Sequence, residues 1–225
     1  MLPEGLIRFG FRLLYNELAF SYDVVAWLVS FGQWAAWRRT VTLFLKEGAI
    51  LELAHGTGGL LTDLNAAGRT SVGLDVSAAM GRLARRRLLQ RGLPLRLVRA
   101  RAQALPFRDA AFANVIATFP TDFILELETL AEARRVLQPN GRLVVVVMGV
   151  LRGPRLLRDV LEWANRITGQ RHLPERDPLL TLEAAGFNAS WQTVSLQGAT
   201  AHLLVGTCRG LGTPGAHDSE VRGCP

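Results

Sequence analysis

A glycine-rich turn after a mostly apolar run is the feature that most constrains this chain. Residues 50–58 read ILELAHGTG, so the run leads directly into Gly56 and Gly58. A second apolar run, residues 71–75, ends in Asp75. Two such runs around a helical pattern predict a strand, a helix and a parallel strand. Glycine lets the backbone approach a ligand, and a carboxylate at the second strand end can accept hydrogen bonds from both ribose hydroxyls. The pattern therefore predicts a site for a nucleoside-containing cofactor.

The spacing of the glycines distinguishes between such cofactors. A dinucleotide site has the pattern Gly-x-Gly-x-x-Gly, but Leu61 occupies the third glycine position here. The pattern present is Glu-x-x-x-Gly-x-Gly, from Glu52 to Gly58. Because no pyrophosphate has to be accommodated, this turn suits S-adenosylmethionine better than a dinucleotide. The alternative is a purely structural glycine turn in an ordinary α/β fold.

Composition and charge indicate whether the chain is a membrane-spanning, disulfide-rich, metal-binding or nucleic-acid-binding protein. No apolar run reaches the roughly 18 residues of a membrane-spanning helix, and the two cysteines, Cys208 and Cys224, indicate neither a disulfide scaffold nor a metal site. We expect no signal peptide and a cytoplasmic location.

The net charge of +7 is a feature of many nucleic-acid-binding proteins. However, Lys46 is the only lysine, and the arginines are scattered apart from a group at residues 82–87. We interpret that group as a solvated helix face and do not expect a nucleic-acid partner, while attraction to anionic lipid stays open.

Strand and helix patterns alternate from residue 48 onward. Apolar strand patterns lie at residues 48–54, 71–75, 95–99, 112–118 and 142–149, and helical patterns at 58–67, 77–91 and 122–137, with Ser77 as a helix N-cap. Later patterns comprise helices at 154–168 and 178–185 and strands at 188–196 and 201–208, the strands joined by Gln197 and Gly198. Continuous apolar strands predict a parallel sheet buried on both faces. The predicted fold is α/β: a Rossmann-like, doubly wound, seven-stranded, mostly parallel sheet with an antiparallel edge hairpin.

The N-terminal segment is predicted to be helical. Residues 1–46 form a cap or lid with helices at 4–18 and 23–46, followed by a cofactor-binding domain at 47–208 and a disordered tail at 209–225. The second helix carries Trp27, Phe31, Trp34 and Trp37 before two arginines. Aromatics beside arginines suit either a membrane interface or a cap packed on the core.

Taken together, these motifs resemble the class I S-adenosylmethionine-dependent methyltransferases. The resemblance is nearest to the ubiquinone/menaquinone C-methyltransferase-like branch and the bacterial phospholipid N-methyltransferases, and it runs from about residue 15 to residue 150. Five segments carry it in order: Tyr22-Asp23 with 30–32 and 37–39; 51–58; 73–77 with Met80; 104–112; and 135–143. The resemblance implies an enzyme that transfers a methyl group from S-adenosylmethionine.

Four positions depart from the family pattern. They are Ala54, where glycine is usual; His55, where a small residue is common; Arg101, where an acid or amide contacts adenine; and Ala113, where an acid is common. Ribose binding through Asp75 carries over, and Ala102 and Gln103 can still present backbone groups to adenine.

The resemblance and the motif positions give the expected site residues. Cofactor-binding residues are Tyr22, Glu52, His55, Gly56, Thr57, Gly58, Asp75, Val76, Met80, Arg101, Ala102, Gln103 and Thr118. A sulfonium methyl group is already activated, so orientation matters most, and a base is needed only for a protonated nucleophile. Candidate bases are His55, Asp23 and Asp122, the last also a candidate helix N-cap. Phe119 and Trp34 are expected to contact the acceptor.

The expected acceptor is small and hydrophobic or lipid-like, either a quinone precursor or a phospholipid amine. The segment TFPT at residues 118–121 differs from the Asn/Asp-Pro-Pro-aromatic sequence of enzymes that methylate the amines of DNA bases. Two alternatives stay open: an RNA methyltransferase, favoured by the basic charge, and a non-catalytic S-adenosylmethionine-binding module, favoured by the altered positions. A membrane surface, contacted peripherally, is a further expected partner. The sequence predicts neither the oligomeric state nor the methylated atom.

Overall fold

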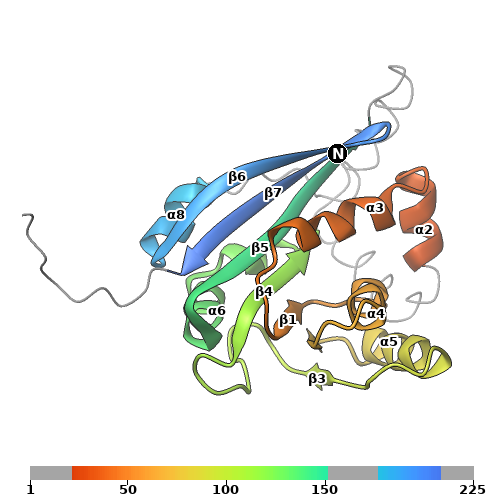
Figure 1. Ribbon diagram of the computed structural model, residues 1–225, viewed down its shortest axis with the longest axis horizontal. Helices are drawn as coiled ribbons and strands as arrows, with labels where there is room; N and C mark the ends of the chain where they lie inside the picture. The colour runs from red at the N-terminus through yellow and green to blue at the C-terminus, as the bar shows by residue number, and fades with distance from the viewer. Residues whose placement is uncertain (1–21, 152–176, 209–225) are drawn as a thin grey trace, which may run out of the picture.

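A seven-stranded sheet forms the centre of the molecule (Figure 1). The computed structural model describes residues 22–151 and 177–208. The strands are β1 (Ile50–Leu53), β2 (Ser71–Asp75), β3 (Leu97–Arg99), β4 (Phe112–Thr118), β5 (Leu137–Leu151), β6 (Phe187–Leu196) and β7 (Ala199–Cys208). Their order is β3-β2-β1-β4-β5-β7-β6, parallel from β3 to β5, with β7 antiparallel to both β5 and β6. This confirms the predicted mostly parallel sheet with an antiparallel edge hairpin.

Helices cover both faces of this sheet, as the doubly wound prediction requires. They are α2 (Tyr22–Val29), α3 (Trp34–Arg39), η2 (Thr40–Phe44), α4 (Gly59–Ala66), α5 (Ala78–Gln90), η3 (Asp122–Leu125), α6 (Leu127–Val136) and α8 (Pro178–Ala184). Leu130 of α6 packs in one core cluster with Leu51 of β1, whereas Trp37 of α3 packs in a second cluster with Ile50. Neighbouring strand residues therefore point to opposite buried faces, which explains the continuous apolar runs.

The single predicted helix over residues 23–46 is wrong, because the chain turns after α2. Phe31 and Gly32 have φ values of 48° and 80°, and the Gly32 N–H donates to the Trp27 carbonyl over 2.9 Å. Ser30 Oγ accepts from the Trp34 N–H at 3.0 Å and so helps to begin α3. A left-handed residue ends a right-handed helix, although the aromatic spacing continues through the turn. The predicted helices at 4–18 and 154–168 and the predicted tail at 209–225 lie outside the described residues.

Two other predicted boundaries are corrected. The helix expected at 122–137 is divided into η3 and α6, because Glu126 has extended backbone angles (φ −65°, ψ 138°). Strand β5 begins at Leu137, before the predicted residue 142, because Leu137 pairs with Phe112 of β4 ahead of an irregularity in the register. Asn140 lies in this irregular stretch with a φ of 59°.

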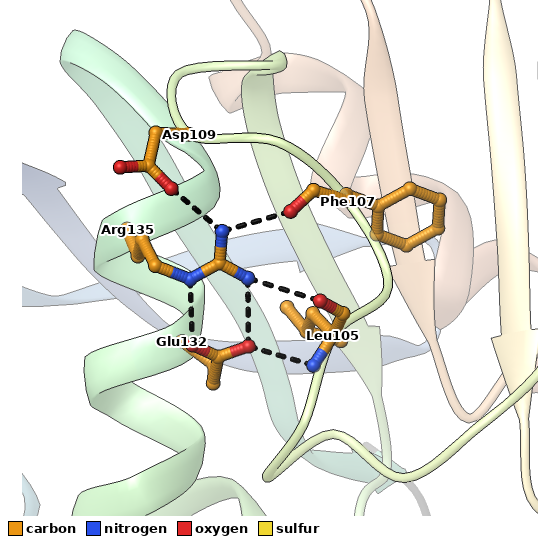
Figure 2. A network of polar contacts seen from close by, with 5 residues as sticks. All are labelled: Leu105, Phe107, Asp109, Glu132 and Arg135. Carbon is orange, nitrogen blue, oxygen red and sulfur yellow. Dashed lines mark hydrogen bonds and ion pairs between the residues drawn. The ribbon is translucent and has the colours of Figure 1, made fainter.

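The segment before β4 is held against α6 by Arg135 (Figure 2). Its guanidinium donates to the carbonyls of Leu105 and Phe107 at 3.0 and 2.8 Å and forms an ion pair with Asp109 at 2.7 Å. It also donates twice to Glu132, which in turn accepts from the Leu105 N–H at 2.7 Å. The hydrogen bonds from Arg135 are the main reason why the pKa of Glu132 is lowered. Several residues of the motifs that carry the family resemblance thus hold the loop before β4 against α6.

Candidate functional site

The glycine turn leaves the carboxyl end of β1 in a series of left-handed conformations. Ala54, Gly56 and Gly58 have φ values of 52°, 54° and 74°. A Cβ on Gly58 would lie 2.7 Å from the Cβ of Ala84 in α5, so only glycine allows this approach of α5. The φ of Ala54 explains why glycine is usual there: an L-residue costs roughly 1–2 kcal/mol in this conformation.

Asp75, at the end of β2, connects the glycine turn after β1 to β2 by hydrogen bonds. Its Oδ2 accepts from the Gly56 N–H at 2.9 Å, and its Oδ1 accepts from the Ser77 N–H at 2.8 Å. Ser77 Oγ accepts from the Met80 N–H at 3.2 Å, which confirms the predicted N-cap of α5. A carboxylate has about four acceptor positions, so both oxygens of Asp75 retain capacity for ribose hydroxyls.

A pocket opens beside this turn, where the strand order reverses between β1 and β4. Ligands bind at such points in open α/β sheets. The lining residues come from α3, from the end of β1, from the start of α4 and from the end of β4: Trp34, Arg38, Glu52, Ala54, His55, Gly56, Thr57, Gly59, Leu60 and Thr118.

Glu52 brings a buried carboxyl group to this pocket. Its side chain is almost fully buried, and Oε2 has no hydrogen-bond partner among the described residues. Burial raises the pKa of Glu52 to about 8, with the negative charges of Asp75 and Asp63 adding to the effect and Arg38 opposing it. Burial therefore favours the protonated form of this carboxyl group.

His55 forms a second wall of the pocket and is also buried. Its Nδ1 lies 2.8 Å from the Gly56 carbonyl, so Nδ1 carries the hydrogen and donates. Burial lowers the pKa of His55, which leaves the ring neutral at pH 7. A Cβ on Gly73 of β2 would lie 2.9 Å from His55 Cδ2, so the ring packs over that glycine.

An aromatic cluster lies at the end of β4. The Phe119 and Trp34 rings are stacked with centroids 4.1 Å apart, and Trp37 meets both edge-on. Phe119 has a φ of 50°, and its N–H donates to the Val146 carbonyl at 2.8 Å, which turns the chain out of the sheet. The stack therefore adjoins the pocket through Trp34.

The structure brings together only some of the predicted site residues. Those that line the pocket are Trp34, Glu52, His55, Gly56, Thr57 and Thr118. Phe119 contacts Trp34, and Gly58 and Asp75 shape the turn. Ala102 is buried in a core cluster, and Val76 is exposed beside Asp75.

Other predicted residues lie apart from the pocket lining. Met80 is in a small core cluster, Arg101 and Asp122 are exposed, and the Gln103 side chain donates to Glu126. Asp122 is the first residue of η3 and not its N-cap, so that alternative is wrong. Tyr22 and Asp23 begin α2, and the positions of their side chains are not described. The functional roles of all these residues stay predictions.

Arg38 lines the pocket but was not among the predicted site residues. The sequence pattern indicates a cap helix at this position, next to Trp37, and no role at the cofactor. The available signal was its position in the Trp-Arg-Arg segment of the family resemblance. Gly59 and Leu60, which also line the pocket, follow the glycine motif directly.

Comparison with known proteins identifies the domain. Residues 50–141 match the methyltransferase domain family. The demethylmenaquinone methyltransferase of Thermus thermophilus is 42% identical over 139 residues, which cover 59% of this chain and 63% of that protein. A ubiquinone/menaquinone biosynthesis C-methyltransferase of Acidiphilium cryptum is 33% identical over 147 residues, 62% of this chain and 59% of that protein. The chain spans less than two thirds of the length of these relatives.

Solved structures share the fold at lower sequence identity. An S-adenosylmethionine-dependent methyltransferase from Thermotoga maritima has a TM-score of 0.61 at 22% identity, covering 84% of this chain and 95% of that one. The [4+2]-cyclase SpnF has a TM-score of 0.54 at 18% identity, covering 75% and 77%. Because the fold is shared with a cyclase, it does not by itself decide the reaction.

Within residues 22–151 and 177–208, no helix has both the length and the apolar character needed to cross a membrane. The comparisons confirm the Rossmann-like fold and the predicted cofactor, S-adenosylmethionine. Residues 50–141 of this chain match the methyltransferase domain family, and the solved structures that share its fold include S-adenosylmethionine-dependent methyltransferases.

Proposed function

We propose that this chain transfers a methyl group from S-adenosylmethionine to a small hydrophobic ring, of the kind found in quinone precursors. The observation that carries the proposal is the Trp34–Phe119 stack, which adjoins the glycine-turn pocket at the carboxyl end of β4. An aromatic face next to a methyl donor suits a flat apolar acceptor. The names of the quinone-methylating relatives support the same acceptor class.

The residues of the pocket fit this cofactor. When bound, S-adenosylmethionine supplies a methyl group that its sulfonium charge has already activated. Asp75 accepts from the ribose hydroxyls, Gly56 allows close approach of the backbone, and Glu52 offers one unpaired carboxyl oxygen to a cationic group. Backbone groups of Ala102 and Gln103 are proposed to meet the adenine.

The proposed role of the protein is mainly orientation and exclusion of water. Phe119 and Trp34 hold the acceptor ring against the pocket. Of the three candidate bases, only His55 lines the pocket among the side chains described; its neutral ring can accept a proton at Nε2. We therefore propose His55 as the group that takes the proton released by the methylated ring carbon.

Titration calorimetry followed by an acceptor assay tests this function. We expect the purified chain to bind S-adenosylhomocysteine and to methylate a demethylated short-chain naphthoquinol, with no turnover on phosphatidylethanolamine or RNA. Turnover on phosphatidylethanolamine or RNA instead would contradict the proposed acceptor and assign the chain to that other acceptor class. Tight cofactor binding without turnover on any of the three would favour a non-catalytic binding module.

A quinone-like acceptor resides in lipid, and we propose that α2 contacts the lipid surface. Val24, Trp27 and Leu28 of α2, together with Phe31 in the turn that follows it, are each at least half exposed. With a net charge of +7, these exposed side chains suit an anionic lipid interface. Cosedimentation with phosphatidylglycerol vesicles should fall when Trp27 and Phe31 are replaced by serine; equal cosedimentation of the wild type and this variant would contradict the contact.

A further inference from the structure

Strand β6 forms one edge of the sheet, and β3 forms the other (Figure 1). Within the described residues β6 pairs with β7 alone, over ten consecutive residue pairs that run from Phe187 with Cys208 to Leu196 with Ala199. The outer side of an edge strand presents backbone N–H and C=O groups to which another strand can bond. The outer side of β6 is therefore a ten-residue site for strand pairing.

The two edges of the sheet differ in how they are protected. Proteins protect edge strands by short length, charged side chains, proline or a bulge. Strand β3 has three residues and ends in the exposed Arg99, and residues 76–108, which include α5 and β3, contain nine arginines and no acidic residue. Strand β6 has none of these features. It is ten residues long, it contains no proline or charged residue, and its pairing with β7 has no irregularity. The β6 edge is therefore open to another strand, whereas the β3 edge is not.

Apolar side chains are exposed beside the same edge. Side chains alternate between the two faces of a strand, so Trp191 lies on the same face of β6 as Phe187. Phe187 is buried in one core cluster with Leu182 of α8. Trp191 is nevertheless 42% exposed, and Leu180 of α8 is 64% exposed. A strand placed against β6 would extend this face and cover part of the indole ring.

The distribution of charge favours a second copy of this chain as the partner. Residues 184–208 contain no Asp, Glu, Lys or Arg, so two copies can bring their β6 strands together without repulsion between like charges. A two-fold axis makes such a contact antiparallel and self-complementary. It also places the two arginine-rich β3 edges at opposite ends of the joined sheet, which keeps them far apart although each chain carries a net charge of +7.

We infer that two copies of this chain pair antiparallel through β6, with Trp191 opposite the partner's Trp191, and form one continuous sheet. Trp191 lies next to the middle of β6, so a register centred on it pairs nearly the whole strand. The residues that line the glycine-turn pocket come from other elements. The dimer therefore leaves the pocket open, and the inference goes beyond the proposed function.

Analytical ultracentrifugation of the full chain over a concentration series tests the inference. The monomer has a mass of 24.7 kDa, and we expect the wild type to shift to twice that mass as its concentration rises through the micromolar range. Hydrogen exchange of the same samples locates the contact, because the amides of residues 187–196 should exchange more slowly in the dimer than after dilution. This measurement uses the wild type alone and does not depend on the folding of a variant.

Trp191→Lys should weaken the dimer at least about tenfold, because it removes an aromatic pair and sets two like charges opposite each other. Leu89→Lys is the matched control. It also replaces an exposed apolar residue, but Leu89 lies on α5, so the dimer should be unchanged. A mixture of Trp191→Lys and Trp191→Glu should form the dimers that each variant alone lacks, because opposite charges then face each other.

A wild type that stays monomeric across the series would overturn the inference. A dimer that Trp191→Lys leaves unchanged, or one whose slowed exchange lies outside residues 187–196, would also overturn it, since the contact would then use another surface. Growth beyond two copies would indicate a head-to-tail contact in place of the two-fold pair. None of these outcomes bears on the proposed function, which calorimetry with S-adenosylhomocysteine tests separately.

Discussion

The two halves of the site are built by different physical means. The cofactor half is a backbone turn held by a carboxylate: Asp75 bonds Gly56 and Ser77 at 2.9 and 2.8 Å, all within a short stretch of sequence. The proposed acceptor half is an aromatic stack between Trp34 and Phe119, which lie far apart in the chain. The comparison teaches that polar geometry shapes the cofactor side through backbone hydrogen bonds, whereas the shape of the proposed acceptor side depends on how distant elements pack.

Removing the carboxylate of the cofactor half should have the largest effect. Asp75→Ala loses the ribose acceptors and the two bonds that hold the turn, so the Kd for S-adenosylhomocysteine should rise at least about 100-fold. Calorimetry measures this. Asp122→Ala, at an exposed aspartate, should change the Kd little. A similar loss in both variants would mean that Asp75 has no special role at the ribose.

The Arg135 network holds the loop before β4 against α6 and belongs to neither half of the site, so its loss should affect stability and not binding. Arg135→Met should lower the free energy of unfolding by about 2–3 kcal/mol, because several hydrogen bonds to Glu132 and the loop carbonyls are lost. Chemical denaturation checks this, with the exposed Arg108→Met as control.

The pH dependence of the Arg135 network has a definite sign. Since the folded-state pKa of Glu132 is lowered, its contribution is present above the unfolded-state pKa and is lost as pH falls through the folded-state value. The stability difference between the wild type and Arg135→Met should shrink in that acidic range. A difference that stays constant with pH would contradict the assigned role of Glu132.

Protonation of Glu52 gives the cofactor half a pH dependence that the acceptor half lacks. Its pKa of about 8 means that the carboxyl is mostly protonated at pH 6–7 and must lose a proton to hold an ammonium group. Affinity for S-adenosylmethionine should therefore rise with pH up to about 8, by at most about tenfold per pH unit, and then level off.

Calorimetry at pH 6, 7 and 8 measures this dependence, and Glu52→Gln should remove it. 5′-Methylthioadenosine, which lacks the amino-acid end, should bind independently of pH in the same range. A pH dependence that survives in Glu52→Gln would assign the titration to another group.

Changes on the acceptor half should have the smallest effect and should spare the cofactor. Phe119→Leu removes an aromatic ring proposed to contact the acceptor. Such an aromatic contact contributes about 0.5–1.5 kcal/mol, so the KM for a quinone-like acceptor should rise about two- to tenfold. The Kd for S-adenosylhomocysteine should stay within about twofold. Phe123→Leu, a half-buried phenylalanine in η3, is the control. Equal losses in KM and Kd would erase the distinction between the halves.

Much of the sheet was predictable, because strands buried on both faces are written as continuous apolar runs. The predicted bounds of β2 and β4 agree with the structure, and Ser77 caps α5 as expected. The helix predicted over 23–46 failed at Gly32, where hydrophobic spacing continues through a turn that a left-handed φ imposes. The spacing of apolar residues indicates which side chains are buried in the core. It does not indicate where the chain changes direction.

By itself, the sequence determined the cofactor half. The glycine turn and Asp75 are joined by hydrogen bonds to backbone groups, and this geometry requires particular residue types at particular spacings. Only the tertiary structure decided that Arg38 lies over Gly59, that Glu52 is buried without a full set of partners, and that Trp34 stacks on Phe119. These arrangements depend on how α3 docks against α4 and the sheet, and docking is set by packing between segments that no local pattern connects.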